Sequence, residues 1–342
     1  MSDAVVAPGA DGIDTVTVTA PGPETSLTKS GQRLWLRQWS LAIGSAAAST
    51  TLSPLHFVFT VTTALYQTPW QAQIRIHNVG QKDMDMLATE YTQATLTAGY
   101  QRPSSQYGVI FDGQVAWYER GRENATDTYL QIYANQRDKE INASTINTTL
   151  PAGYTQLDVV KACAQAMGIP LGYVSDLGDV KSPRARALYG MARDVLRDVA
   201  QTANATSFIQ DGKLVVLVQG DALPGSVVVL NSASGLIGVP AQTLGGGIRA
   251  VSLLNPFIRP ATMVQINQAD INKLTAGPGA TVSEQTRIQR DTAGIAADGF
   301  YKVVSATHRG DNRGNPWFTE IVCVPIDPTQ QGSPAIQAPQ VH

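Results

Sequence analysis

Four histidines are the residues best suited to acid–base or metal chemistry in this 342-residue chain. His308 precedes Asp311 by three positions in "ATHRGD", and a histidine beside an aspartate could serve as the base of a hydrolase. No Gly-x-Ser-x-Gly motif supplies a nucleophile, so we interpret His308 as a histidine at the edge of a polar turn. His56 and His77 fall on the polar faces of alternating segments, without His-Glu-x-x-His or paired-cysteine spacing. The sequence therefore predicts neither a metal site nor a cofactor.

Carboxylates are the second group with catalytic potential, because two of them set apart in a cleft would indicate a glycosidase. The chain has 27 acidic residues, so some pair can always be chosen. Glu90, Glu119 and Glu123 have no sequence context that distinguishes them from surface acids. We therefore predict that the chain is not an enzyme.

A run of three glycines stands beside an arginine in "TLGGGIRAVSLLNPFIRPATMVQIN". No Gly-Lys-Ser/Thr follows, and the next residues have the pattern of a strand, so neither a phosphate-binding loop nor a dinucleotide fingerprint is indicated. We expect segment 243–267 to be a hairpin that opens a β unit, with prolines turning the chain. Since glycine permits close backbone approach, Gly245, Gly246 and Gly247, together with the nearby Arg249, are candidate interface residues.

Five tryptophans fall in or next to predicted strands, and core packing explains most of them. Trp70, directly after Pro69, is our candidate for an interface anchor. The two cysteines, Cys163 in a helical pattern and Cys323 in a strand pattern, resemble small buried apolar residues and predict no disulfide framework.

Charged residues make up only 15% of the chain, against roughly 25% in an average soluble domain. Two interpretations stay open: a surface that ends up against other protein, or a β-rich domain with threonine-lined strands. The net charge of −2 gives no field for nucleic acid, and no specificity for it is expected. The N-terminus lacks the pattern of a signal peptide, and no apolar run reaches the roughly 20 residues of a membrane span.

The hydrophobic period changes twice along the chain and divides it into segments. We expect an extended arm at 1–33, a first β domain, either a barrel or a sandwich, at 34–150, an α/β insert domain at 151–225, a second β domain at 226–328 and a tail at 329–342. The fold class is thus mainly β with an α/β insert (α+β).

Local signals predict individual elements within these segments. Thr155 and Gly168 bound one predicted helix, and a second is expected from about 182 to 202, with Ser182 as N-cap and Pro183 in its first turn. Asp211-Gly212 predicts a hairpin turn, and Asp112-Gly113 a tight turn or bulge. A short strand is expected at 14–20 and a helical turn at 82–88.

Three stretches, in this order and spacing, resemble the baseplate hub proteins of contractile-tailed bacteriophages, which share a fold with the N-terminal part of type VI secretion spike proteins. They are "HFVFTVTTALYQTPWQAQIRIHNV" with "GVIFDGQVAWYERGRENATDTYLQIYA", then "LYGMARDVLRDVAQTANATSFIQDGKLVVL", and finally the glycine-containing stretch above with "GFYKVVSATHRGDNRGNPWFTEIVCVP". Together they cover roughly residues 34–326. No cell-wall-cleaving module is appended.

The resemblance implies two tube-type β-barrel domains flanking a small helix–helix–hairpin domain. It also implies a homotrimer that adapts the sixfold tail tube to the threefold central spike. Expected partners are therefore further copies of the chain, tail tube proteins, the central spike protein and other baseplate proteins. The expected location is the tail baseplate of the virion, after assembly in the host cytoplasm. The alternatives are a tail-associated cell-wall hydrolase and a receptor- or carbohydrate-binding tail protein.

Overall fold

The computed structural model describes residues 35–45, 48–52, 55–66, 68–80, 93–101, 106–243, 247–267, 271, 281 and 299–326. The two expected terminal arms, the strand expected at 14–20 and the helical turn expected at 82–88 lie outside the described residues.

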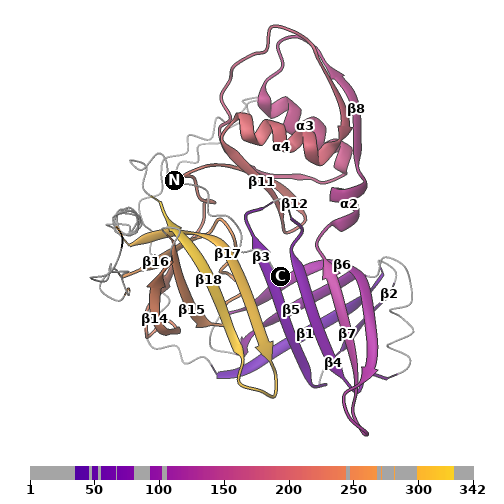
Figure 1. Cartoon of the computed structure of the whole chain (residues 1–342), viewed down its shortest axis with the longest axis vertical. Helices are drawn as coiled ribbons and strands as arrows, with labels where there is room; N and C mark the ends of the chain where they lie inside the picture. The colour runs from indigo at the N-terminus through magenta and orange to yellow at the C-terminus, as the bar shows by residue number, and fades with distance from the viewer. Residues whose placement is uncertain are drawn as a thin grey trace, which may run out of the picture.

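Two β units and a small α/β insert make up the described chain (Figure 1). The first β unit contains seven strands: β1 (Trp35–Ser45), β2 (Ala48–Leu52), β3 (Phe57–Ala64), β4 (Gln71–His77), β5 (Gln93–Gln101), β6 (Tyr107–Arg122) and β7 (Thr128–Asn135). The second contains six: β13 (Val228–Leu230), β14 (Leu236–Gln242), β15 (Ile248–Leu253), β16 (Met263–Ile266), β17 (Phe300–Asp311) and β18 (Trp317–Pro325). The mainly β character predicted from the sequence is confirmed.

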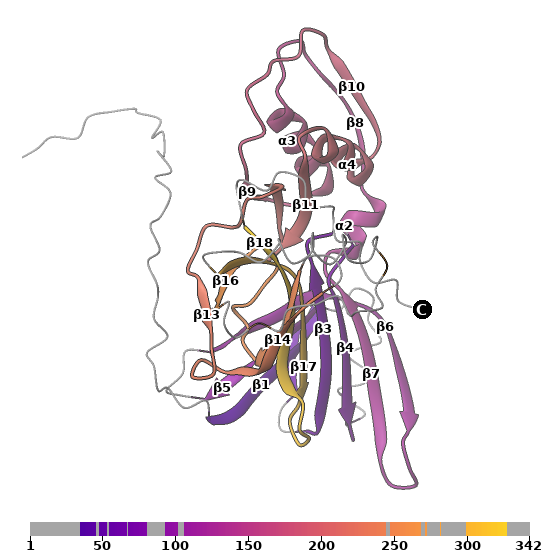
Figure 2. The ribbon, with the colours of Figure 1, turned by 60° about the vertical axis from the view of Figure 1, so that its left-hand side comes forward.

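All 13 strands of the two units belong to one sheet, in the order β14-β15-β18-β17-β3-β4-β7-β6-β5-β1-β2, with β13 and β16 attached beside β17. The sheet curls strongly, like half of a barrel (Figures 1 and 2). Antiparallel pairing of β17 with β3, from Ser305 opposite Ala64 to Asp311 opposite Val58, joins the units. The described strands therefore form a single curled sheet rather than two separate barrels.

Each β unit nevertheless has its own hydrophobic core. In the first unit, alternation directs Phe57, Phe59 and Val61 of β3 inward, as the sequence predicts. The core of the second unit is built around Tyr301 and Ile321. One sheet thus carries two cores, and the β3–β17 pairing lies between them.

The α/β insert stands above the sheet in Figure 1. It comprises α2 (Asp138–Ala143), β8 (Thr145–Leu150), α3 (Gln156–Met167), β9 (Leu171–Val174), β10 (Arg186–Met191), α4 (Ala192–Thr202), β11 (Ala205–Gln210) and β12 (Lys213–Val218). The signals at Thr155 and Gly168 are confirmed: Thr155 forms a capping box with Asp158, and Gly168 adopts φ 65° at the helix end. The β11–β12 hairpin turns at Asp211-Gly212, both with positive φ, also as predicted.

Three predictions about elements are wrong. The helix expected at 182–202 begins only at Ala192, because residues 186–191 pair with β8 as strand β10 and Gly190 has φ 118°. Asp112-Gly113 forms neither a turn nor a bulge: the pair lies inside β6 in continuous register with Thr95 and Ala94 of β5, and a side chain at Gly113 would collide with the Phe111 ring and the Asn135 carbonyl. Segment 243–267 is not one hairpin: β15 pairs with β14 and β18, whereas β16 pairs with β13 and β17.

Candidate functional site

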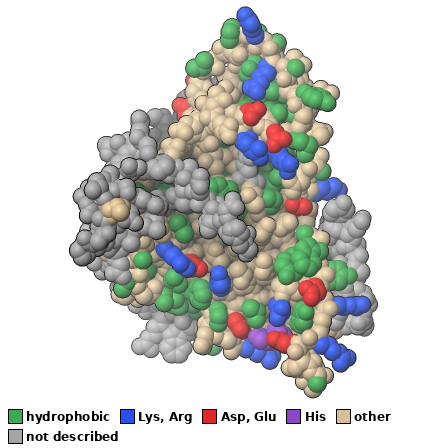
Figure 3. All heavy atoms as spheres, in the orientation of Figure 1, with side chains coloured by type: hydrophobic (Ala, Val, Ile, Leu, Met, Phe, Trp, Pro, Cys, Tyr) green, Lys and Arg blue, Asp and Glu red, His purple; other side chains and the backbone are tan. Residues whose placement is uncertain are grey.

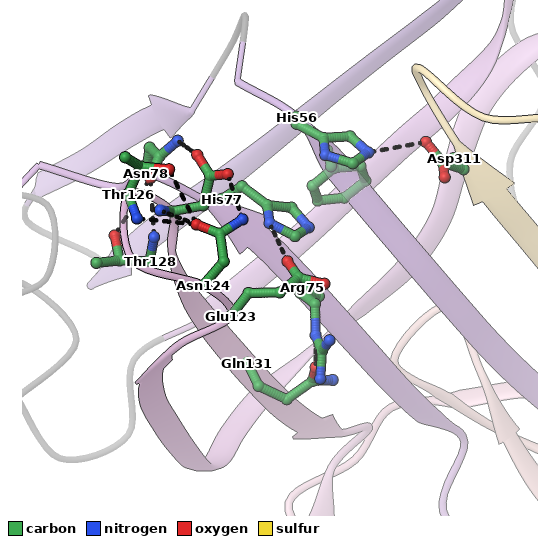
Figure 4. A network of polar contacts seen from close by, with 12 residues as sticks. His56, Arg75, His77, Asn78, Glu123, Asn124, Thr126, Thr128, Gln131 and Asp311 are labelled. Carbon is green, nitrogen blue, oxygen red and sulfur yellow. Dashed lines mark hydrogen bonds and ion pairs between the residues drawn. The ribbon is translucent and has the colours of Figure 1, made fainter.

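Two histidines meet at one end of the sheet, on its polar face (Figure 4). His56 lies just before β3 and His77 ends β4, and the backbone N–H of His77 donates to the carbonyl of His56 at 3.0 Å. Pairing of the two strands therefore stacks the rings, with centroids 4.3 Å apart and 14° between their planes.

Each imidazole bonds a carboxylate from a different hairpin turn. His56 Nε2 lies 3.1 Å from Asp311, at the end of β17, and His77 Nδ1 lies 3.0 Å from Glu123, after β6. Within the described part of the chain, the side-chain partners of the two rings are these carboxylates, and neither ring bonds a hydroxyl or thiol. The arrangement ties both turns to the edge of the sheet where β3 begins and β4 ends.

The expected placement of His308 is wrong. Its side chain is buried between the sheet strands, with Nδ1 2.9 Å from the hydroxyl of Thr319, and it does not contact Asp311. Asp311 pairs with His56 instead, across 255 residues of sequence. Burial lowers the pKa of His308 to about 3, so the ring is neutral in the folded protein.

The surroundings of the cluster lower the pKa of both His77 and Asp311. Burial, aided by the charges of His56 and Arg75, lowers the pKa of His77, although Glu123 opposes that shift. Burial raises the pKa of Asp311, but hydrogen bonds from the backbone N–H groups of Arg313 and Gly314 and from His56 outweigh it, so the net shift is downward. Neutral pH therefore favours a neutral His77 and an ionised Asp311.

A hollow of about 540 Å³ opens over this cluster. Arg75 is among the residues that line it, donating to Gln131 at 2.8 Å and lying 4.5 Å from the centroid of the Tyr129 ring. Charges of both signs line the hollow, which suits hydrogen bonding to polar groups of a partner. In the described residues, no group of three or more histidine, cysteine or acidic side chains is placed to hold a metal ion.

Asn312, directly after β17, is hydrogen-bonded to the segment where β3 begins, at the same end of the β3–β17 pair. Its side-chain oxygen accepts from the backbone N–H of Phe57 at 2.9 Å, and its side-chain nitrogen donates to the carbonyl of Leu55 at 2.7 Å. Arg37 of β1 donates to the carbonyls of Asp311 and Asn315, at 2.8 and 3.0 Å. Side chains of the first unit and the β17–β18 turn of the second therefore join the two halves of the sheet.

An exposed tryptophan marks another part of the first β unit. Trp117 in β6 is 53% exposed and stacks on Tyr133 of β7, with ring centroids 3.8 Å apart. Figure 3 shows hydrophobic side chains on the side where Figure 1 places these strands. The exposure of Trp117 was not predicted from the sequence; the charged run "ERGRE" after it is the signal that this part of β6 leaves the core.

The predicted interface residues have different surroundings. Trp70 is buried in the first core, and its indole N–H donates to the carbonyl of Ala64 at 3.1 Å. Gly247 is buried and accepts from the backbone N–H of Thr243 at 2.8 Å, while Arg249 is 60% exposed and pairs with Glu320. Gly245 and Gly246 lie outside the described residues. Their roles as interface residues stay predictions.

Comparison with protein families decides the identity of the chain. The family model described as "Baseplate hub gp41" matches residues 65–278, more than half of the sequence. The chain belongs to the baseplate hub gp41 family. It is therefore a structural component of a phage tail baseplate, as the sequence resemblance predicts. No protein of curated function matches this hub protein.

Solved structures with the same fold come from tails and secretion systems. The 43 kDa tail protein of prophage MuSo2 from Shewanella oneidensis is 8% identical, with a TM-score of 0.55, over 85% of the hub protein and 98% of that chain. The tail protein from Neisseria meningitidis MC58 is 10% identical, with a TM-score of 0.53, over 84% and 96%. The E. coli c3393 protein, a component of the type VI secretion system, is 11% identical, with a TM-score of 0.53, over 86% and 79%. At these identities the likeness is one of fold.

Two further observations bear on the sequence predictions. Cys163 and Cys323 are both free and buried, as predicted. None of the described helices combines the length and hydrophobicity of a membrane span.

Proposed function

We propose that this hub protein is a homotrimer that adapts the sixfold tail tube to the threefold central spike. The observation that supports it best is the presence of two β units with separate cores in one sheet. If each unit acts as one tube-type barrel, three copies supply six such units around an axis and present a threefold symmetric face on the other side. Because each chain carries two β units, three chains would match the sixfold tube on one side and the threefold spike on the other.

The proposed partners are other copies of the chain, tail tube proteins, the spike protein and other baseplate proteins. Low charge supports this assignment, since interface cores are depleted of charged residues. A closed ring would also cover strand edges that otherwise invite aggregation. Assembly would take place in the host cytoplasm, before incorporation into the virion.

The proposed role is structural and requires no turnover. The His56–His77 cluster supports this, because its side chains bond one another and fasten hairpin turns. We extend the proposal to the domain limits 34–150, 151–225 and 226–328, and to Trp70, Gly245, Gly246, Gly247 and Arg249 as interface residues. The core of the insert also takes in Ile141 and Ile146, which precede residue 151.

Reconstitution tests the adaptor role. The purified chain is mixed with the tube and spike proteins of the same phage, and the complexes are imaged by cryo-electron microscopy. The expected result is a three-copy ring with a sixfold tube on one face and a trimeric spike on the other. A chain that binds neither protein would contradict the proposal, and hydrolysis of purified peptidoglycan by the chain would favour the cell-wall hydrolase instead.

A further inference from the structure

The β11–β12 hairpin has one face in the core of the insert and the other against the sheet (Figure 1). Along β12, Leu214 and Val216 belong to the insert core, whereas Val215, which lies between them, belongs to a smaller cluster shared with both β units. The buried residues of this cluster, the joint, are Leu65, Phe208, Val215, Leu217 and Ala261. All buried residues of the insert core lie within residues 141–216, so the insert keeps its core if it parts from the sheet at the joint.

Arg259, from the segment between β15 and β16, connects the tip of this hairpin to both β units. Its Nη1 donates to both carboxylate oxygens of Asp211, in the hairpin turn, at 2.7 and 2.5 Å. Its Nη2 donates to the carbonyl of Val109 in β6 at 2.9 Å, and its Nε donates to the carbonyl of Pro256 at 3.1 Å. The Asp211 side chain is 58% exposed, so dissolved salt screens this ion pair, the latch.

Each of the two connections between the insert and the sheet contains a residue with positive φ. Arg137, before α2, has φ 51°, and Gly220, after β12, has φ 99°. Just beyond Gly220, the buried side chain of Lys302 in β17 donates to the carbonyl of Asp221 at 2.8 Å and fixes the chain to the sheet. Hinges are a few residues at the ends of elements that absorb changes in φ and ψ. Arg137 and Gly220 have these positions.

Packing between the insert and the first β unit is incomplete on the side of α4. A cavity of about 270 Å³ lies there, and its lining includes Leu196 of α4, Phe208 of β11 and Trp70 of the β3–β4 connection. Domains of one chain move relative to each other unless the interface between them is large and hydrophobic. Here the apolar contact is the joint, with the cavity beside it, so the latch adds to a small apolar contact in holding the insert.

We propose that the latch holds the insert in a closed position, and that loss of the Arg259–Asp211 ion pair lets the insert swing on Arg137 and Gly220 and uncover the joint. The swing exposes the apolar outer face of the β11–β12 hairpin while the insert core stays closed. Salt favours the open position because the ion pair is exposed. This device belongs to a single chain and does not depend on the number of copies in the assembly.

Thiol labelling of the full chain tests the latch. Val215→Cys places a thiol in the joint, and the native Cys163 and Cys323, buried in the cores of the insert and of the second β unit, report unfolding. Adding Asp211→Asn should make iodoacetamide label the introduced thiol about fivefold faster, the effect of losing an exposed ion pair, with Cys163 and Cys323 unchanged. Asparagine tolerates the positive φ of residue 211, so the hairpin turn is kept.

Asp194→Asn is the matched control, because Asp194 is 52% exposed and pairs with Arg197 within α4. It should leave the labelling unchanged. Raising the salt concentration from about 0.05 to about 0.5 M should accelerate labelling of Val215→Cys as Asp211→Asn does, and should add nothing once Asp211→Asn is present.

Ser207→Cys gives a second, nearly isosteric site, because Ser207 is 1% exposed and lines the cavity. Its labelling should respond to Asp211→Asn and to salt in the same way. Labelling that neither change accelerates at either site would overturn the inference. Labelling of the introduced thiols only as fast as Cys163 would also overturn it, since the insert would then unfold rather than swing. A chain that forms no trimer and binds neither tube nor spike would overturn the proposed function alone.

Discussion

At the scale of single residues, the burial of His308 makes the stability of the folded protein depend on pH. The folded protein keeps this ring neutral down to pH about 3, whereas an unfolded chain takes up the proton near pH 6.5. The folded state therefore binds fewer protons between these values. The free energy of unfolding must fall as the pH drops through this window, by up to about 1.4 kcal/mol per pH unit.

Replacing His308→Gln should remove most of this dependence between pH 7 and pH 5, because glutamine keeps a polar partner for Thr319 but does not titrate. Urea unfolding at several pH values measures the slope. His56→Gln serves as the control, because His56 lies in the partly exposed cluster. An unchanged slope in His308→Gln would show that another group carries the acid sensitivity.

Gly310 in β17 fits under two aromatic rings. A β-carbon there would overlap the Phe59 ring and come within 2.9 Å of Trp317. Overpacking of this kind typically costs about 1–3 kcal/mol, so Gly310→Ala should lower the free energy of unfolding by that amount. Gly225→Ala is the matched control, because its β-carbon would meet no atom within 4 Å. Equal stability of both variants in urea would disprove the close fit.

At the scale of elements, the sequence predicts best where the determining residues are neighbours. Thr155 and Asp158 cap α3 within three residues, and Gly168 ends it. Strand β10 could not be found in this way, because its partner β8 lies about 40 residues earlier, and only this pairing overrides the helical pattern of 182–191. For the same reason the sequence did not predict the His56–Asp311 pair, whose members lie 255 residues apart.

The cap of α3 gives a local test. Thr155→Ala removes the oxygen that accepts from Asp158 N–H and should destabilise the protein by about 1 kcal/mol, while Thr155→Ser should be nearly neutral. Thermal unfolding of the two variants measures the difference. Equal destabilisation by serine and alanine would mean that packing of the threonine methyl group, rather than capping, is responsible.

The role of Asn312 in holding β3 and β17 together can also be tested. Asn312→Ala removes two side-chain hydrogen bonds to the segment before and at the start of β3, and should lower the free energy of unfolding by about 1–3 kcal/mol. Hydrogen exchange should increase in β3 and β17 together. Asn315→Ala is the control, because Arg37 contacts only its backbone carbonyl. Faster exchange confined to the β17–β18 turn would contradict a role in joining the units.

At the scale of the whole molecule, alternation in "HFVFTVT" and "WQAQIRIH" was enough to predict a mainly β fold with inward and outward faces. It was not enough to predict that both β units share one sheet, because that depends on β17 pairing with a strand some 250 residues away. The exposure of Trp117 was missed for a related reason: an extra residue in β6, between Val115 and Trp117, shifts the register against β7.

Native mass spectrometry of the purified full-length chain tests the central claim most directly. Two β units per chain can match a sixfold tube only if three chains assemble, so the predicted spectrum is dominated by the mass of three copies. The same species should bind one trimeric spike. A chain that remains a strict monomer at all concentrations and in the presence of its tube and spike neighbours would contradict the account.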